Sequence, residues 1–297
     1  MSERLEGVYV PLTTPFVGDK VSTDKFKENI EKYNLTGLAG YVISGSTGES
    51  VFISDNETEE LVKSAKEAAS ADKKIIAGTG KESTKATIEF TNRIADLGID
   101  AALVKTPSYF KARIDQEALR KHYLIVAEQS RVPLIIYNIP QNTGISVDSR
   151  LIIELSRHPN IAGIKDSSGN LATLGEVIPH LDSHFNFLMG AASIFLAGLM
   201  EGASGGILAV ANAAPAHCVK LYKLFLEKKF KDALKIQLDI IPLNKAIIQT
   251  FGIPGLKYGL DLLGYYGGPC RLPLLPLEEK GKVEMAAILK NLGLLKK

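Results

Sequence analysis

One lysine of this chain has the surroundings of a nucleophile. Lys165 ends the apolar run Ile161–Lys165, in which the alternation of a β-strand puts Ile161, Gly163 and Lys165 on one face. Gly163 leaves room there for a long side chain. Burial disfavours the charged form of an amine, so a neutral nucleophile that can attack a carbonyl carbon becomes accessible near neutral pH. A lysine whose head group reaches solvent is the competing interpretation, and the position alone favours neither.

Two other residues bear on that choice. Lys105 also ends an apolar strand, but Thr106 and Pro107 start a loop at once, which favours a solvated ammonium at the mouth of the fold. Tyr137 ends the strand before that of Lys165, so its phenol is placed to exchange protons with an intermediate on the lysine. A buried tyrosine with an ordinary hydrogen bond is the commoner case, but the pairing on adjacent strands favours the catalytic role.

The segment Gly45-Ser46-Thr47-Gly48 is suited to bind a carboxylate, because it offers backbone N–H groups and two hydroxyls. A tight turn alone would use the same glycines. The segment Gly78–Ser83 does not match a phosphate-binding loop, because its glycine spacing differs and Glu82 stands where Ser or Thr would follow Lys81. The sequence shows no metal-ligand cluster of histidines and carboxylates and no dinucleotide fingerprint.

The elements that must position these residues follow a repeated βα pattern. Strands are expected near residues 7–13, 40–44, 74–78, 101–106, 133–139, 161–165, 185–189 and 206–210, with amphipathic helices such as 57–70, 84–97 and 116–129 between them. Eight strands favour a closed (β/α)8 TIM barrel, whose reactive groups gather at the C-terminal strand ends. An open, doubly wound α/β sheet is the alternative. The pattern after Val210 is helical, over roughly 215–227, 231–250, 254–263 and 277–292. We predict a single domain, 1–297, with the barrel in 1–227 and a C-terminal helical extension in 228–297.

The bulk composition argues against several classes of protein. The 297 residues carry a net charge of +2 and are 45% hydrophobic, which is typical of a globular protein and gives no basic patch for nucleic acid. Cys218 and Cys270 belong to no spaced cluster, which argues against a disulfide framework and for a reducing compartment. No apolar run has the length of a membrane span, and Met1–Val10 lacks the features of a targeting segment. We expect a cytoplasmic protein, with the mitochondrial matrix as the alternative location.

Five motifs, in order along the chain, resemble those of the dihydrodipicolinate synthase and N-acetylneuraminate lyase superfamily of class I pyruvate aldolases. They are Thr13-Thr14-Pro15-Phe16, Gly45-Ser46-Thr47-Gly48-Glu49, Thr106-Pro107-Ser108-Tyr109, Tyr137-Asn138-Ile139-Pro140 and Gly163-Ile164-Lys165-Asp166-Ser167. The resemblance implies a Schiff base between Lys165 and pyruvate, with no metal and no organic cofactor. It implies proton transfer by Tyr137, aided by Ser46 and by a Tyr109 inserted from a neighbouring subunit, and therefore a homodimer or homotetramer. The substrate would be bound by Ser46, Thr47, Asn142, Ser167, Gly206 and Ile207.

The same resemblance narrows the substrate. The segments Phe251–Lys257 and Gly264–Arg271 are most similar to 4-hydroxy-2-oxoglutarate aldolase, although that group tends to have Asn in place of Thr47. Dihydrodipicolinate synthases usually have an Arg at the position of Asn142, where it grips a second carboxylate with two hydrogen bonds. Neuraminate lyases have acidic residues where this chain has Ala191-Ala192-Ser193, so a short substrate is favoured.

We therefore predict a carbon–carbon lyase that cleaves a short 4-hydroxy-2-oxo acid to pyruvate and an aldehyde, with 4-hydroxy-2-oxoglutarate giving glyoxylate. Two alternatives share this chemistry: a 2-keto-3-deoxy sugar acid aldolase, which Thr47 permits, and a dihydrodipicolinate synthase, which Asn142 disfavours. A non-catalytic 2-oxo acid binding protein is the alternative from another class, but binding alone needs no activated amine.

Overall fold

The computed structural model describes residues 5–295, which contain eight barrel strands and a short hairpin. The barrel strands are β1 (Gly7–Pro11), β4 (Gly40–Ile43), β5 (Lys74–Gly78), β6 (Ala101–Lys105), β7 (Leu134–Asn138), β8 (Ile161–Asp166), β9 (Asn186–Met189) and β10 (Gly205–Ile207). They form a closed barrel in the order β1-β10-β9-β8-β7-β6-β5-β4. The predicted (β/α)8 barrel with a C-terminal helical extension is confirmed.

The chain divides into two compact units. One combines the N-terminal stretch up to Gly7 with Lys74–Ile207, and the other combines Val8–Lys73 with the chain from Leu208 onward. Each unit is described by itself below. The single domain predicted over 1–297 stays a prediction, and residues 1–4 and 296–297 lie outside the described part.

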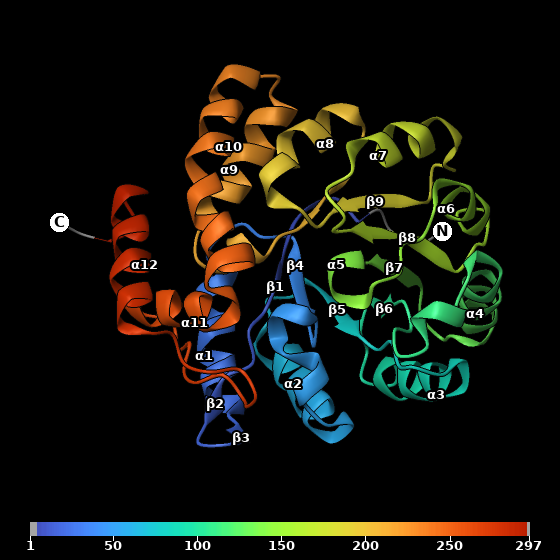
Figure 1. Cartoon of the computed structure of the whole chain (residues 1–297), viewed down its shortest axis with the longest axis horizontal. Coiled ribbons are helices and arrows are strands. Elements are labelled where there is room, and N and C mark those ends of the chain that lie inside the picture. Colours follow the sequence, from blue (N-terminus) through green and yellow to red (C-terminus); the bar gives the residue numbers. More distant parts are fainter. Residues whose placement is uncertain (1–4, 296–297) are drawn as a thin grey trace. The chain divides into compact units, whose positions relative to one another are not determined.

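The first unit carries the strands β5 to β10, which pair in parallel with their sequence neighbours. Every residue of β7 and β8 is buried, as expected for parallel strands that are covered on both faces. The helices of this unit lie around the outside of these strands (Figure 1). They are α3 (Thr84–Ala95), α4 (Gln116–Gln129), α6 (Ser149–Leu155), α7 (Leu171–Val177) and α8 (Phe195–Glu201). The short helix α5 (Pro140–Thr143) follows β7 directly.

Local sequence explains where several of these helices begin. Ser83, Asp115 and Asp148 stand immediately before α3, α4 and α6, and each side chain accepts a hydrogen bond from a backbone N–H of the first turn. Such caps satisfy donors that the helix itself leaves unpaired. The predicted helices 84–97 and 116–129 are therefore confirmed to within two residues.

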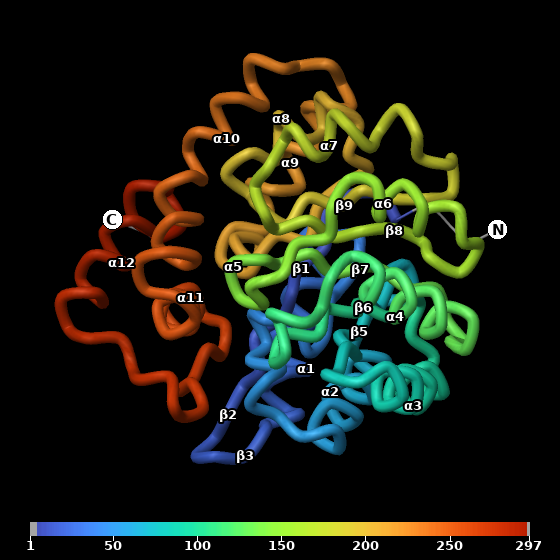
Figure 2. The backbone as a smooth tube through the Cα atoms, turned by 45° about the vertical axis from the view of Figure 1, so that its right-hand side comes forward, coloured from blue at the N-terminus to red at the C-terminus, as the bar shows by residue number. Residues whose placement is uncertain are grey.

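The second unit contains the parallel pair of β1 and β4 and the antiparallel hairpin of β2 (Phe16–Val17) and β3 (Lys20–Val21), which the sequence analysis did not predict. Its helices pack as the pairs α1 with α2, α9 with α10 and α11 with α12 (Figure 2). They are α1 (Thr23–Asn34), α2 (Asp55–Ala68), α9 (Pro215–Leu226), α10 (Phe230–Lys245), α11 (Gly252–Leu262) and α12 (Glu279–Asn291), and a π-helical turn, Ala246–Thr250, joins α10 to α11. Gly255 of α11 lies close to the buried Met285 of α12, because a Cβ on Gly255 would be 3.3 Å from the Cε of Met285.

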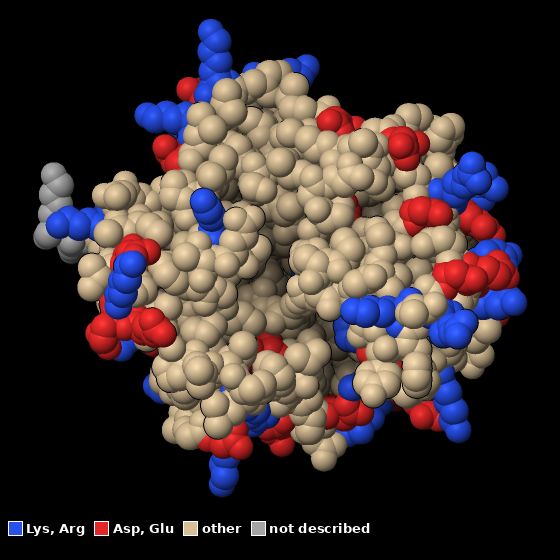
Figure 3. Space-filling model, viewed as in Figure 1, with Lys and Arg blue, Asp and Glu red and all other residues tan. Residues whose placement is uncertain are grey.

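The predicted end of the last barrel strand is wrong. The last barrel strand was expected to reach Val210, but β10 ends at Ile207 because Ala209–Asn212 form a 3₁₀ turn. That turn is held by the buried Asn212, whose Nδ2 donates to the carbonyls of Pro11 and Ala209. On the face shown in Figure 3, acidic and basic side chains are interspersed, as the small net charge leads one to expect. None of the helices in residues 5–295 is both long and apolar enough to span a bilayer.

Candidate active site

Two buried side chains on neighbouring strands stand out in the first unit. Tyr137 of β7 and Lys165 of β8 are register partners, and the two residues are 5% and 4% exposed. Nζ of Lys165 lies over the face of the Tyr137 ring, 4.0 Å from its centroid. Within residues 5–295, no carboxylate lies within ion-pair distance of this amine. The amine is therefore free to attack a carbonyl carbon, with a phenol beside it.

Lys105, the rival nucleophile, lies in the same row of the sheet, opposite Tyr137. Its Nζ is 3.2 Å from Oε1 of Glu82, and its side chain is 23% exposed. The head group of Lys105 is therefore ion-paired at a partly exposed strand end, and its solvation stays a prediction. An ammonium held by a carboxylate has no lone pair for attack, which favours Lys165 as the nucleophile.

A buried polar pair that the sequence analysis missed holds these two strand ends together. Asn138 donates from Nδ2 to Oδ1 of Asp166 across 2.7 Å, and its own Oδ1 accepts from the N–H of Val147. Asn138 and Asp166 directly follow Tyr137 and Lys165, so this pair limits the relative movement of the reactive side chains. Their position one residue after each reactive group is the signal that could have identified them.

Gly163 is required by the close approach of a neighbouring strand. A Cβ placed on Gly163 would lie 2.2 Å from the backbone oxygen of Asn186 in β9, so only glycine permits this approach of two strands. The Asn186 side chain fills the adjoining space, where its Nδ2 donates to the carbonyl of Ala162 across 2.8 Å. That Gly163 also makes room for Lys165 stays a prediction. Strand register places the lysine opposite Tyr137.

Four predicted substrate-binding residues lie at the strand ends of the first unit. Ser167 is half-buried, two residues after Lys165, and Asn142 is exposed on α5. The side chain of Gln141, next to Asn142, donates to the carbonyl of Ser167 across 3.2 Å, which ties α5 to the end of β8. Gly206 and Ile207 are buried in β10, two strands away from β8.

Tyr109 lies on an exposed loop that Glu82 organises. The carboxylate of Glu82 accepts from the N–H groups of Ser108 and Tyr109, across 2.8 and 2.9 Å, besides pairing with Lys105. Desolvation opposes the charge, but these hydrogen bonds and Lys105 outweigh it and lower the pKa of Glu82 to about 2. Tyr109 is 80% exposed, and its ring contacts Phe110 edge to face. Insertion of Tyr109 into another subunit stays a prediction.

Ser46 and Thr47 belong to the second unit, where they are half-buried in the 3₁₀ turn Ser46–Gly48 after β4. The turn lies between two non-glycine residues with positive φ, Ser44 at 54° and Glu49 at 57°. Such backbone persists only where its surroundings enforce it, and it is common at binding sites. Position 48 also requires glycine, because a Cβ there would lie 2.9 Å from the carbonyl oxygen of Leu12.

A buried ion pair underlies this turn. Oε1 of Glu49 is 2.5 Å from Nζ of Lys257 in α11, and both residues are 1% exposed. The same Nζ donates to the carbonyl of Pro269, while Oε2 of Glu49 accepts from the N–H of Arg271. Burial lowers the pKa of Lys257, and the charge of Glu49 opposes that shift. The C-terminal extension is thus attached to Glu49, the residue that directly follows the predicted carboxylate-binding segment.

Arg271 strengthens the same attachment. Its guanidinium donates to Glu57 across 2.7 Å and to Asp19 across 3.0 Å. Both Arg271 and Lys257 lie over the ring of Phe16, at 4.4 and 4.5 Å from its centroid. The segments Phe251–Lys257 and Gly264–Arg271, which carry the likeness to 4-hydroxy-2-oxoglutarate aldolase, therefore support the turn that holds Ser46 and Thr47.

Other reactive groups offer no competing site. Cys218 and Cys270 are free, and burial raises the pKa of each to about 12, so neither is poised as a nucleophile. Residues 5–295 contain no group of three or more His, Cys, Asp or Glu that could hold a metal ion.

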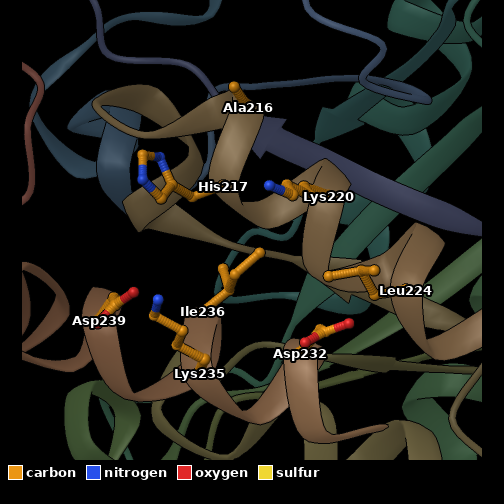
Figure 4. Close-up of a pocket in the computed structure, with 8 residues that line it drawn as sticks. All are labelled: Ala216, His217, Lys220, Leu224, Asp232, Lys235, Ile236 and Asp239. Atoms are coloured by element: carbon orange, nitrogen blue, oxygen red, sulfur yellow. The ribbon is translucent and has the colours of Figure 1, made fainter. Parts of the chain in front are cut away.

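A groove lies between α9 and α10 of the second unit, and Figure 4 shows its side chains. His217 and Lys220 come from α9, and Lys235 and Asp239 come from α10. Burial lowers the pKa of His217, while Asp239 and Lys220 act on it in opposite directions. Charges of both signs line this groove, so it favours no single class of ligand.

Comparison with known proteins gives consistent matches over nearly the whole chain. The model of the dihydrodipicolinate synthetase family matches residues 4–292. The 4-hydroxy-tetrahydrodipicolinate synthase of Methanothrix thermoacetophila is 34% identical over 290 residues, which cover 97% of both chains.

Two solved structures also match this chain over nearly its full length. The dihydrodipicolinate synthase of Acinetobacter baumannii, solved in complex with pyruvate, is 31% identical with a TM-score of 0.93 and covers 98% of this chain and 99% of its own. The dihydrodipicolinate synthase of Aquifex aeolicus is 30% identical with a TM-score of 0.93 and covers 99% of this chain and 100% of its own.

Proposed function

Because this chain belongs to the dihydrodipicolinate synthetase family, a family of class I pyruvate aldolases, we propose that it cleaves 4-hydroxy-2-oxoglutarate to pyruvate and glyoxylate. Enzymes of this family form a Schiff base between a lysine and pyruvate and use no external cofactor. The arrangement of Lys165 over Tyr137, on adjacent strands, is the observation that supports this chemistry here.

The proposed reaction begins with imine formation. The neutral amine of Lys165 attacks the 2-oxo carbon, and Tyr137 transfers protons while the carbinolamine loses water to give a protonated imine. In the next step Tyr137 removes the proton from the 4-hydroxyl. The electrons of the bond between carbons 3 and 4 then move into the imine, and the aldehyde leaves. Protonation of the resulting enamine at carbon 3 and hydrolysis of the imine release pyruvate and restore Lys165.

Asn142 supports the choice of substrate. It is exposed on α5, where an amide cannot form the charged two-point contact that an arginine makes with a carboxylate. The lack of acidic side chains in Ala191-Ala192-Ser193 supports a short substrate over a long polyol.

The names of the relatives support a second candidate, in which pyruvate condenses with aspartate semialdehyde as in a dihydrodipicolinate synthase. Thr47 leaves a 2-keto-3-deoxy sugar acid as a third substrate of the same chemistry. The carboxylate-binding roles of Ser46 and Thr47, the pocket-lining roles of Ser167, Gly206 and Ile207, and a homodimer or homotetramer completed by Tyr109 are further parts of the proposal. We also propose a cytoplasmic location.

Borohydride reduction with pyruvate, followed by peptide mass spectrometry, tests the nucleophile. We expect a stable adduct on Lys165 in the native chain and in Lys105→Met, and none in Lys165→Met. An adduct on Lys105 would show that the nucleophile is misassigned.

Side-by-side assays test the substrate, with 4-hydroxy-2-oxoglutarate, 2-keto-3-deoxygluconate, and pyruvate plus aspartate semialdehyde. We expect the highest kcat/KM with the first, and Asn142→Arg should increase the condensation with aspartate semialdehyde. A clear preference of the native enzyme for aspartate semialdehyde would overturn the Asn142 argument and establish the second candidate.

A further inference from the structure

Two cations stand on the loop between β6 and α4. Lys111 and Arg113 are exposed in a 3₁₀ turn, Lys111–Arg113, that follows the Tyr109 loop. Within the described chain, residues 5–295, neither has an ion-pair partner, whereas Lys105 at the end of β6 is paired with Glu82. The loop therefore presents positive charge that no protein group neutralises.

Lys111 lies against the end of α5. A Cβ placed on Gly144, the residue that ends this helix, would be 3.0 Å from Cδ and 3.5 Å from Nζ of Lys111. Gly144 has a φ of +70°, and its N–H donates to the carbonyl of Pro140 across 2.8 Å. The lysine stem thus occupies the space that a side chain at position 144 would take, and its ammonium is held beside α5.

Helix α5 is part of the wall around the reactive strand ends. It begins two residues after Asn138, and its Gln141 is hydrogen-bonded to the carbonyl of Ser167. Ser167 in turn donates its N–H to the carbonyl of Asn138, and it follows Lys165 by two residues. Lys111 is therefore connected to the neighbourhood of Lys165 through one short helix, all within the first unit.

The residues of α5 are Pro, Gln, Asn and Thr, so the helix itself supplies no charge to a bound substrate. A five-carbon 2-oxo dicarboxylate that is joined to Lys165 through carbon 2 carries a second carboxylate at its far end. We infer that Lys111 binds this distal carboxylate and thereby selects 2-oxo dicarboxylic acids over monocarboxylic ones. This inference deepens the proposed function and rests on the imine at Lys165.

A purely structural role makes a different prediction. A lysine near the C-terminal end of a helix also interacts favourably with the exposed carbonyl groups there. In that case removal of the charge would lower the stability of the α5 turn and would affect all 2-oxo acids alike. Selectivity between two acids of equal length therefore separates the two roles.

The experiment compares borohydride trapping of 2-oxoglutarate and of 2-oxopentanoate, which have the same chain length and differ in the distal carboxylate. In Lys111→Met, which keeps the unbranched stem and removes the charge, we expect the 2-oxoglutarate concentration for half-maximal trapping to rise about tenfold to a hundredfold. The value for 2-oxopentanoate should stay unchanged. Lys121→Met is the matched control, since Lys121 is exposed on α4 and its Nζ is 3.4 Å from Glu117. We expect it to change neither value.

Each other outcome counts against the inference. Equal changes for both acids in Lys111→Met would assign Lys111 a structural role. A native enzyme that traps pyruvate on Lys165 but shows no preference for 2-oxoglutarate over 2-oxopentanoate would overturn the role of Lys111 alone. No trapping of pyruvate would overturn the proposed function, and the inference with it.

Discussion

The buried pair of Glu49 and Lys257 gives the sharpest test of how the second unit is held together. Substitution of Glu49 by Gln keeps an acceptor for the N–H of Arg271 and removes only the charge. It leaves the ammonium of Lys257 buried without a counter-charge, because both residues are 1% exposed.

The size of the effect follows from that burial. Removal of one partner of a buried ion pair costs about 3–5 kcal/mol, because the remaining charge stays desolvated. At about 2 °C per kcal/mol for a chain of this length, the Tm of Glu49→Gln should fall by about 6–10 °C. Lys257→Met should show a loss of similar size. The double substitution should be more stable than either single one, because it buries no unpaired charge.

Thermal unfolding followed by circular dichroism measures these changes, and the pyruvate concentration for half-maximal borohydride trapping reports on the Ser46–Gly48 turn. We expect that concentration to rise in the single variants, since Glu49 directly follows the Ser46–Gly48 turn. Asp96→Asn is the control, because Asp96 and its partner Arg131 are 60% and 63% exposed and such surface pairs contribute less than about 1 kcal/mol. The reasoning fails if Glu49→Gln changes Tm no more than Asp96→Asn does, or if the losses of the two single variants simply add in the double variant.

Three further predictions concern the first unit. Tyr137→Phe should lower kcat by about a hundredfold to ten-thousandfold while some borohydride adduct on Lys165 still forms; unchanged kcat would exclude the phenol as the proton carrier. Gly163→Ala should destabilise the fold by at least about 1–3 kcal/mol, measured by denaturant unfolding, because the new Cβ would lie 2.2 Å from a backbone oxygen of β9. Gly175→Ala on α7 is the matched control, since the nearest atom is 4.0 Å away and alanine is the better helix former; equal losses in both variants would contradict the packing argument. Burial lowers the pKa of His122 to about 4 from 6.5, so the unfolded chain takes up a proton first as the pH falls, and about 3 kcal/mol of stability should be lost between pH 6.5 and 4. His122→Gln should remove that part of the loss in unfolding measurements across this pH range, whereas the same substitution at the exposed His180 should not.

The fold was predictable because its signals are local. Each barrel strand is a short apolar run, the major helices have an amphipathic period, and helices such as α2, α3 and α4 also begin at a capping residue. These signals need no long-range information. The hairpin of Phe16–Val17 and Lys20–Val21 was missed because strands of two residues show no alternation to detect. The end of β10 was misplaced because Asn212, five residues beyond that strand, turns the chain through contacts that sequence does not reveal.

The candidate site was predictable only in part. Lys165 and Tyr137 were identified from position on their strands, and the register of β7 and β8 brings them together. The partners of Lys105 and Glu49 were not predictable, because Glu82 and Lys257 are brought to them by folding rather than by sequence spacing. The packing constraint on Gly163 was not predictable either, because it comes from the neighbouring strand β9.

The row of register partners Lys105, Tyr137, Lys165 and Leu188 has an evolutionary consequence. The separation of amine and phenol is set by the spacing between hydrogen-bonded strands, which every parallel sheet shares. Insertions and substitutions in the surrounding loops can therefore exchange one aldehyde partner for another without rebuilding the machinery of carbon–carbon cleavage. New substrate specificities can arise in such a barrel by substitutions in the loops around the strand ends, while the strand residues that carry out the cleavage stay constant.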